Sequence, residues 1–301
     1  MSNIQAWIIS LRLRTLPLAL STIFMGSFLA AADKQFNNHV LIWAALTTLF
    51  LQILSNLAND YGDARSGADN DERQGPRRMI QSGKISMKQM KSAVIVTAFL
   101  ALISGSVLIL SALQGHQFIG FLFFLMGVLA IAAAIKYTVG KNPYGYRGLG
   151  DLYVFIFFGI MGVSGTFFLH TGIWHWPVLL PAVAIGLFST GVLNLNNIRD
   201  IESDRKTGKK TLPVLIGRKK AATYHLLLLA GGWIFLATWI FLYAQETRFW
   251  IILPALPLVI KSVVAVFRFN RPASELDKEL RNLSAGTLLV VLLFGLQTLI
   301  L

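Results

Sequence analysis

The chain has 301 residues, of which 55% are apolar and only 14% are charged. Because about 25% of the residues of a soluble globular protein are charged, this composition excludes a pair of soluble domains. The chain contains no cysteine, which excludes a disulfide framework, a thiolate nucleophile and a Cys-ligated zinc or iron–sulfur site.

Apolar blocks of nearly 20 residues recur along the chain, and a helix of about 20 residues crosses the roughly 30 Å hydrocarbon core of a bilayer. Nine such spans are predicted, at residues 16–32, 39–58, 92–113, 118–136, 152–170, 177–196, 222–243, 249–267 and 283–301. The first 20 residues lack a small-residue cleavage site, so we expect no removable signal peptide. We therefore predict an all-α polytopic membrane protein, a single domain over residues 1–301, with nine transmembrane helices around a central cavity that opens near the cytoplasmic side.

Basic residues gather in alternate connections between the spans. The amino terminus and the connections 59–91, 136–150, 197–220 and 268–281 contain 24 of the 27 Lys and Arg residues. Lys34 and Arg248 lie on the other side, and we expect Lys261, inside the eighth span, to snorkel toward the cytoplasm. By the positive-inside rule, the amino terminus and these connections are predicted to be cytoplasmic. The net charge of +13 is thus mainly a topology signal, and we expect no nucleic-acid partner.

Two matched rows of polar residues follow the second and sixth spans: Asn56, Asp60 and Asp63, and then Asn196, Asp200 and Asp204. If the spans continue as helices, each row shares one helix face, because side chains three or four positions apart are neighbours. Carboxylates so spaced repel one another and are costly near the hydrocarbon, so a cation between the rows is predicted. Oxygen ligands without Cys or a nearby His favour magnesium as that cation.

Basic residues are interleaved with both rows, which suits a diphosphate bound together with magnesium. The candidates are Arg65, Arg73, Arg77 and Arg78 in the first connection and Arg205, Lys206, Lys209 and Lys210 in the second. Of these, we assign diphosphate binding to Arg65, Arg73, Arg77, Lys206 and Lys210. The alternatives are that single Asp residues are helix caps or solvated charges and that the basic residues only determine topology. Asp69, Asp71 and Glu72 are expected to be ordinary loop charges, although Asp69 could join the site.

The connection after the fourth span is rich in tyrosine and glycine, with the sequence KYTVGKNPYGYRGLGD at residues 136–151. Glycines permit close approach of a ligand, and tyrosines supply flat walls and hydroxyl donors, which suits an aromatic second substrate. We assign acceptor binding to Lys136, Tyr146, Arg147 and Asn197, and catalysis to Asp151 and Tyr137. Asp151 could accept a hydroxyl proton from the acceptor or could cap the following span, and the sequence leaves both roles open.

These motifs together resemble the UbiA-type intramembrane prenyltransferase superfamily. The resemblance rests on NDYGD after the second span, on NNIRDIESD after the sixth, and on the nine spans. Within that superfamily, RLRTLP at 12–17, NLANDYGDARSGAD with the DERQGPRRMIQSG that follows, KYTVGKNPYGYRGLGD, and GKKTLPVLIG at 208–217 are similar to the members that prenylate 1,4-dihydroxy-2-naphthoate. In one departure from the simplest superfamily spelling, the first motif has Gly67 where a third Asp would stand and offers Asp69 instead.

The resemblance implies a magnesium-dependent aromatic prenyltransferase of menaquinone biosynthesis, in which Asn56, Asp60, Asp63, Asp200 and Asp204 would hold the magnesium. Such an enzyme transfers a polyprenyl group from polyprenyl diphosphate to 1,4-dihydroxy-2-naphthoate, with loss of carbon dioxide and diphosphate, and gives a demethylmenaquinone. It implies a multi-pass protein of the bacterial cytoplasmic (inner) membrane, with the lipid bilayer as its surroundings and no obligate protein partner.

Three other functions are considered from the sequence. The first is a prenyltransferase of the same superfamily for another acceptor, of the 4-hydroxybenzoate, homogentisate or chlorophyllide type. The second is a secondary transporter, which would place polar breaks near the membrane midplane and form an inverted repeat, whereas here the polar clusters follow the ends of spans. The third, a phospholipid-modifying phosphotransferase, would need one compact Asp motif instead of two distant ones.

Overall fold

The computed structural model describes residues 3–67, 78–244, 248–269, 272 and 275–299, and all the regular secondary structure within them is helical. The elements in chain order are α1 (Asn3–Leu11), η1 (Leu13–Thr15), α2 (Leu16–Ala32), α3 (Asn38–Ser66), α4 (Met87–Ala112), α5 (Gln117–Lys136), η2 (Tyr144–Arg147), α6 (Gly150–Val154), η3 (Phe155–Ser164), α7 (Gly165–Thr171), η4 (Trp176–Val178), α8 (Leu179–Arg199), α9 (Ile201–Lys206), α10 (Leu212–Ile216), α11 (Arg218–Tyr243), η5 (Phe249–Ala255), α12 (Leu256–Phe267) and α13 (Leu276–Leu299).

The described residues contain nine helical segments that are long and apolar enough to cross a membrane. These segments are Ile4–Ala32, Asn38–Ser66, Met87–Ala112, Gln117–Lys136, Gly150–Thr171, Trp176–Arg199, Arg218–Tyr243, Phe249–Phe267 and Leu276–Thr298. The predictions of an all-α membrane protein and of nine spans are therefore confirmed. Several helices begin or end beyond the apolar block that predicted them. In particular, α3 continues to Ser66, so the whole first polar row lies on one helix.

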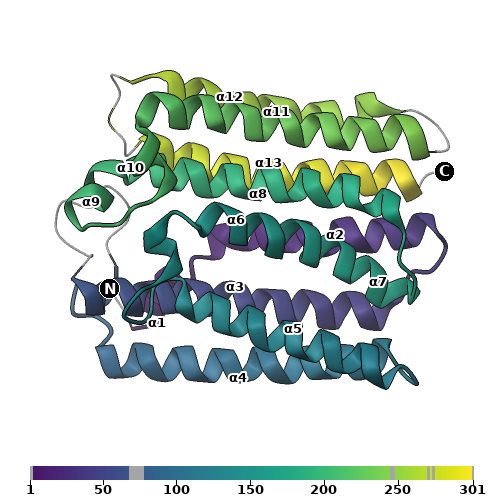
Figure 1. Cartoon of the computed structure of the whole chain (residues 1–301), viewed down its shortest axis with the longest axis horizontal. Coiled ribbons are helices and arrows are strands. Elements are labelled where there is room, and N and C mark those ends of the chain that lie inside the picture. Colours follow the sequence, from purple (N-terminus) through teal and green to yellow (C-terminus); the bar gives the residue numbers. More distant parts are fainter. Residues whose placement is uncertain (1–2, 68–77, 245–247, 270–271, 273–274, 300–301) are drawn as a thin grey trace.

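The spans lie side by side in the plane of Figure 1. On one side of the molecule, α3 packs against α4 and α5, and on the other α8 packs against α11 while α12 packs against α13. Between them, α2 contacts α13 and α3, and the segment α6–η3–α7 contacts α8 and α2. The helix α5 packs mainly on α3 and α4, and none of its residues is buried. One side of α5 is therefore free to form the wall of a cavity.

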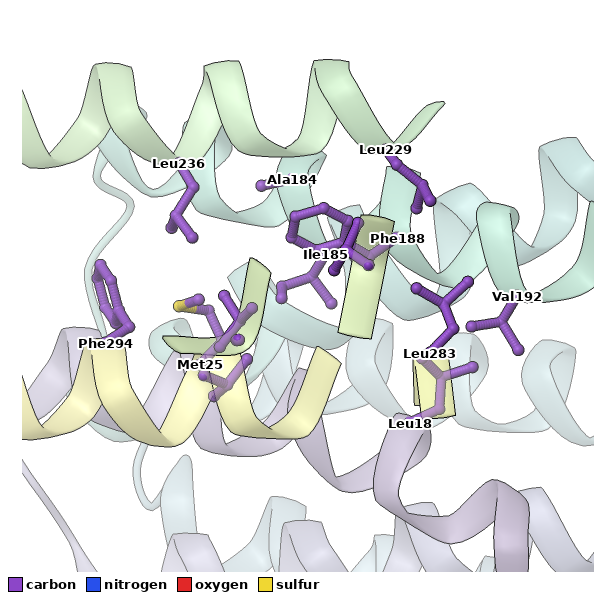
Figure 2. Packing of buried hydrophobic residues seen from close by; sticks show 14 of the residues in the cluster. Leu18, Met25, Ala184, Ile185, Phe188, Val192, Leu229, Leu236, Leu283 and Phe294 are labelled. Atoms are coloured by element: carbon purple, nitrogen blue, oxygen red, sulfur yellow. The ribbon is translucent and has the colours of Figure 1, made fainter. Parts of the chain in front are cut away.

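The largest buried cluster joins α2, α8, α11 and α13, and Figure 2 shows Met25, Ile185, Phe188, Leu229 and Phe294 within it. Inside a bilayer the hydrophobic effect does not hold helices together, so close packing at small residues matters more. Gly26 on α2 provides such a contact, because an added Cβ would lie only 2.5 Å from the backbone oxygen of Val163 on η3. Any larger residue at position 26 would push α2 away from η3.

Local signals set the ends of the helix that carries the first polar row. Asn37 caps the start of α3, where its side-chain oxygen accepts hydrogen bonds from the backbone N–H groups of His39 (2.9 Å) and Val40 (3.4 Å). Gly67 ends α3 with φ 72°, a left-handed conformation that glycine adopts without a Cβ penalty. The first polar row therefore occupies the last three turns of a helix that is defined at both ends.

Candidate active site

The first polar row lies on the buried side of α3. Asn56, Asp60 and Asp63 are all at most 3% exposed. The backbone of Thr138, just after α5, lies directly against Gly62, where an added Cβ would come within 2.7 Å of the Thr138 carbonyl. The Thr138 hydroxyl also donates to the backbone oxygen of Ala58 (3.0 Å). Glycine at position 62 thus allows the Tyr-rich connection to cross α3 between Asp60 and Asp63.

Each carboxylate of the first row has basic partners. The Arg12 guanidinium donates to Asp60. Arg78 reaches both acids, with Nε 3.5 Å from Asp60 Oδ1 and Nη2 2.5 Å from Asp63 Oδ2. Lys209 Nζ lies 2.9 Å from Asp63 Oδ1, and the Tyr146 hydroxyl donates to the same oxygen. Because buried charges are stable only when paired, these contacts explain how two carboxylates remain side by side in the helix.

The second polar row keeps its helical spacing although α8 ends at Arg199. The Asp200 amide bonds the Asn196 carbonyl (3.1 Å), and the Asp204 amide bonds the Asp200 carbonyl (2.8 Å). The Arg199 guanidinium holds both Asp200 carboxylate oxygens, at 2.9 Å and 2.7 Å, and donates to the Asn196 side chain (2.8 Å). The expected pattern of one amide and two carboxylates facing the same way is therefore preserved across the helix junction.

Asp277, at the start of α13, links the second row to the amino terminus. Arg199 Nη1 lies 2.8 Å from Asp277 Oδ1, and Arg14 Nη1 lies 2.7 Å from Asp277 Oδ2. The Ser284 hydroxyl also donates to the backbone oxygen of Arg14 (3.3 Å). Asp277, in the first turn of α13, pairs with the Arg199 guanidinium, and that guanidinium pairs with Asp200. The orientation of Asp200 therefore depends on α13.

Lys209 joins the two rows. Its ammonium pairs with Asp63 of the first row, and its backbone amide bonds the carbonyl of Asp204 in the second (2.9 Å). The same ammonium lies 4.8 Å from the centre of the Tyr146 ring, within the range of a cation–π contact. Thr211 then donates to the Asp204 carboxylate (3.3 Å). The first connection, the Tyr-rich connection and the second connection therefore meet around one lysine.

A cavity of about 440 Å³ opens beside these groups. Its polar end is lined by residues of both rows and by three basic side chains, namely Asn56, Asn59, Asp63, Asn196, Asn197, Asp200, Asp204, Arg12, Arg78 and Lys209. Away from that end the wall is apolar and includes Leu51, Leu108, Phe123, Phe157 and Met161. Along α3 the lining runs from Asp63 to Ala44, 19 residues or about 28 Å at 1.5 Å per residue. The cavity therefore combines a charged head with a long apolar channel.

A π-helical segment forms part of the channel wall. η3, between α6 and α7, is wider than an α-helix and presents Phe157, Phe158, Met161 and Gly162 to the cavity. Such π-helical turns are uncommon and are frequent at functional sites. This segment was predicted only as part of an apolar span, because hydropathy does not distinguish a π-helix from an α-helix.

The structure brings seven of the sixteen predicted site residues to the cavity. Its described lining includes Asn56, Asp63, Tyr137, Tyr146, Asn197, Asp200 and Asp204. Asp60 lies just behind that wall, bonded to the lining residues Arg12 and Arg78. The proposed diphosphate ligands Arg73 and Arg77, and also Asp69, fall outside the described residues.

Five predicted ligands do not lie at the cavity. These exposed residues, outside the described lining, are Arg65, Lys136, Arg147, Lys206 and Lys210. The basic residues that the structure places there instead are Arg12, Arg78 and Lys209. Arg78 and Lys209 were among the basic candidates from the sequence but were not assigned to diphosphate binding, and Arg12 was noted only as part of the RLRTLP motif. Arg14, Arg199 and Asp277 were not identified from the sequence either. Arg14 and Arg199 were counted only as topology charges, and all three pair with residues that are distant in the sequence.

Two of the four tyrosines that line the cavity, Tyr137 and Tyr146, have raised pKa values and are suited to donating hydrogen bonds. Burial raises the pKa of the Tyr137 hydroxyl far above its usual value, and neighbouring Tyr144 and Asp151 raise it further. Burial and the Asp63 carboxylate likewise raise the pKa of Tyr146. A tyrosine with a raised pKa keeps its proton, so Tyr137 can donate a hydrogen bond to a bound oxygen but is a poor source of a phenolate base.

Asp151 is not the helix cap that the sequence offered as one alternative. Leu149 is the N-cap of α6, and Asp151 lies within the first turn. The carboxylate is buried at 8% exposure, lies outside the described cavity lining, and forms a hydrogen bond with Tyr224 of α11. Its Oδ2 atom is buried without a hydrogen-bond partner in the described structure. In this arrangement Asp151 joins α6 to α11.

This position leads to a prediction for Tyr224. Replacing Tyr224 with Phe removes the hydroxyl that donates a hydrogen bond to the buried Asp151 carboxylate. Loss of this hydrogen bond is expected to lower the free energy of unfolding by about 1–3 kcal/mol. Thermal unfolding of the purified variant measures the loss, and activity per folded molecule should stay close to wild type. A variant that is as stable as wild type but inactive would instead place the Asp151–Tyr224 pair in the reaction.

The donor set at the polar end fits magnesium. Carboxylate and amide oxygens are its preferred protein ligands, and magnesium usually takes one or two carboxylates and shares its shell with substrate phosphates. Among the described residues, no group of three or more His, Cys, Asp or Glu side chains forms a ready metal cage. An open set of oxygens beside Arg12, Arg78 and Lys209 fits a cation that arrives with an anionic ligand.

Similarity to known proteins agrees with this geometry. Residues 19–294 match the model of the UbiA prenyltransferase family. The chain is 44% identical to the 1,4-dihydroxy-2-naphthoate octaprenyltransferase of Haemophilus influenzae over 301 residues, covering 99% of this chain and 97% of the relative. It is also 44% identical to the enzyme of that name from Escherichia coli, covering 98% and 95%.

Solved structures show the same fold at lower identity. The apo structure of a UbiA homolog from Aeropyrum pernix superposes with a TM-score of 0.70 at 18% identity, covering 95% of this chain and 98% of that one. A UbiA homolog from Archaeoglobus fulgidus bound to DMAPP and Mg²⁺ gives a TM-score of 0.56 at 17% identity, covering 93% and 98%. With a family match over nearly its whole length and relatives of this identity, the chain belongs to the UbiA prenyltransferase family.

Proposed function

We propose that this protein transfers a polyprenyl group from polyprenyl diphosphate to 1,4-dihydroxy-2-naphthoate, releasing diphosphate and carbon dioxide and forming a demethylmenaquinol, the reduced form of demethylmenaquinone. The observation that carries the proposal is the cavity, which extends for about 28 Å along α3 and has a cationic and carboxylate-lined end that continues as an apolar channel. A polyprenyl diphosphate has the same two parts, a charged diphosphate and a long hydrocarbon tail. The names of the relatives in Haemophilus influenzae and Escherichia coli support the choice of acceptor.

In this proposal the diphosphate lies at the polar end. Arg12, Arg78 and Lys209 face the cavity there and can contact its oxygens. The residues proposed to hold magnesium are Asn56, Asp60, Asp63, Asp200 and Asp204. Magnesium, when bound, neutralises the diphosphate and stabilises the charge that develops as it leaves.

The remaining steps follow from the chain's own residues. Lys209 and Arg78 stabilise the electron pair that passes to the diphosphate when the allylic C–O bond breaks. Phe157 and Met161 line the apolar wall and exclude water that would capture the allylic cation. The ring carbon that bears the carboxylate then bonds to the cation, and the electrons of the C–CO₂ bond restore the aromatic ring. Tyr137 and Asn197, both on the wall, can orient the acceptor by hydrogen bonds.

We further propose that the chain acts as a single domain in the bacterial inner membrane with its amino terminus in the cytoplasm. Support comes from the concentration of basic residues in the connections at one end of the spans. With this orientation, the polar end of the cavity faces the cytoplasm.

The test is a transfer assay on the purified protein in bilayer nanodiscs. Magnesium, a radiolabelled prenyl diphosphate and a panel of acceptors (dihydroxynaphthoate, 4-hydroxybenzoate and homogentisate) are supplied separately. We expect product only with dihydroxynaphthoate, together with labelled carbon dioxide from a carboxyl-labelled acceptor. Excess chelator should abolish the reaction, and added magnesium should restore it. Product with another acceptor alone would overturn the proposed substrate, and full activity in chelator would overturn the metal requirement.

A further inference from the structure

A second cavity, of about 200 Å³, lies among α11, α12 and α13, away from the candidate active site. Three basic residues line it, Arg218 at the start of α11, Lys261 within α12 and Arg268 at its end. The acids Glu275 and Glu279, from the start of α13, line it as well. These five charged groups carry a net charge of +1, and none of them lines the first cavity.

The three basic residues of this cavity are not held in ion pairs with other described residues. Within the described part of the chain, no ion pair involves Arg218, Lys261 or Arg268, although two carboxylates line the same cavity. The Arg218 Nε atom is buried without a hydrogen-bond partner there, and the guanidinium lies 5.9 Å from the ring of Phe269. Because a buried donor without a partner is costly, this arrangement indicates an anion that the protein itself does not supply.

The surroundings of the cavity face lipid. Ile260 and Val264, which line it on α12, are 49% and 43% exposed in a helix that is apolar enough to span the membrane. Lys261 precedes Arg268 by seven residues, or about 10 Å along a helix axis. A lysine at that depth extends toward the polar boundary, where Arg218 and Arg268 lie at the ends of their helices. The cations therefore meet at the level of the lipid headgroups, above an apolar surface.

We propose that this cavity binds the headgroup of an anionic phospholipid, with its phosphate on Arg218, Lys261 and Arg268. The single negative charge of a phosphodiester balances the net charge of the cavity, and basic pockets between transmembrane helices suit anionic headgroups. Headgroup hydroxyls, as in phosphatidylglycerol, can donate to Glu275 and Glu279. The acyl chains would lie along Ile260 and Val264. The alternative is that these cations only set topology, in which case any basic residue at this end would serve equally.

The experiment compares two triple variants with equal loss of charge. The test variant carries Arg218→Gln, Lys261→Gln and Arg268→Gln. The control carries Lys219→Gln, Lys220→Gln and Lys278→Gln, three exposed residues of α11 and α13 outside the described cavity lining. Each protein is mixed with phosphatidylglycerol, phosphatidylethanolamine or phosphatidylcholine in detergent, and bound lipid is measured by native mass spectrometry. Thermal unfolding shows that each variant is folded, and a single Lys261→Gln variant provides a milder test.

We expect wild type and control to bind phosphatidylglycerol more tightly than phosphatidylcholine. The test variant should bind phosphatidylglycerol about 100-fold more weakly, because each basic residue near the headgroup contributes roughly fivefold, and Lys261→Gln alone should lose about fivefold. Equal weakening in the control would show diffuse attraction and overturn the site, as would equal binding of the three lipids. Displacement of the lipid by millimolar inorganic phosphate would show that a free anion, and not a lipid, is the ligand.

Discussion

Replacing Asp63 with Asn is expected to lower kcat/KM for prenyl transfer by at least about 100-fold, the loss typical when a preorganised electrostatic contact to the reacting groups is removed. Asp63 lines the polar end of the cavity and is the residue at which Arg78, Lys209 and Tyr146 converge. Asn has nearly the same shape but carries no charge, so it weakens magnesium binding and releases both cations from their partner. Steady-state kinetics over a range of magnesium concentrations measure the effect.

The matched control for Asp63→Asn is Glu202→Gln. Glu202 lies in the second connection on α9, pairs only at the surface with Arg205 at 3.1 Å, and is outside the described cavity lining. Surface pairs of this kind are worth little, so Glu202→Gln should behave as wild type. If Asp63→Asn keeps near wild-type activity and magnesium dependence while folded, Asp63 is not part of the active site.

Asn is a better substitution than Ala at these acids because each of them has a basic partner. The Arg199 side chain is only 1% exposed and donates to both oxygens of Asp200. Ala at position 200 would remove one of the two carboxylates that pair with this buried guanidinium among the described residues, and breaking a buried pair costs about 3–5 kcal/mol. A loss of activity in such a variant would then report misfolding as much as chemistry.

Replacing Gly127 with Leu is expected to shorten the prenyl chain that the protein accepts. Gly127 lines the apolar channel on α5, and an added Cβ there would meet no atom within 4 Å. A leucine side chain can therefore enter the channel without distorting the helix, and Leu is also the better helix former. Gly127 precedes Lys136, the last residue of α5, by nine residues, which places it about 14 Å along the channel from the polar end.

The effect of Gly127→Leu should depend on the length of the substrate. Forcing extra atoms into an occupied space costs about 1–3 kcal/mol, which corresponds to a 5- to 150-fold loss of kcat/KM, and we expect this loss for octaprenyl diphosphate. Geranyl diphosphate, whose tail ends before this position, should react within about threefold of wild type. The control is Val128→Leu, on the exposed face of the same helix. Equal loss with both substrates would place the tail elsewhere.

The sequence predicts the fold well because hydropathy alone defines the spans. The block 16–32 coincides with α2, and the spacing of Asn56, Asp60 and Asp63 predicts their shared helix face. The choice among neighbouring basic residues is not predictable in the same way. Lys209 faces the cavity while Lys210 is exposed, and that difference depends on the turn at Gly208, where φ is 75°. Local pattern does not specify which side of such a turn packs inward.

Long-range pairing accounts for the other residues that the sequence did not identify. Asp277 was not singled out from the sequence, because its partners Arg14 and Arg199 are 263 and 78 residues away. Asp151 was assigned to catalysis, with a cap as the alternative, from the glycines and tyrosines beside it and its place before an apolar span, and its hydrogen-bond partner in the structure is Tyr224 on α11. In both cases the contacting residues belong to other parts of the chain. The residue pattern within one connection therefore cannot predict these contacts.

The link from Arg14 through Asp277 and Arg199 to Asp200 also has a consequence for biogenesis. Spans enter the membrane in the order of synthesis, and α13 is the last of those described. Until α13 docks, Arg199 has no Asp277 beside it, and Arg14 has no contact that holds it in place. The eight earlier spans therefore wait in the bilayer as an incomplete bundle, and the charged end of the cavity takes its final form only when the last span is inserted.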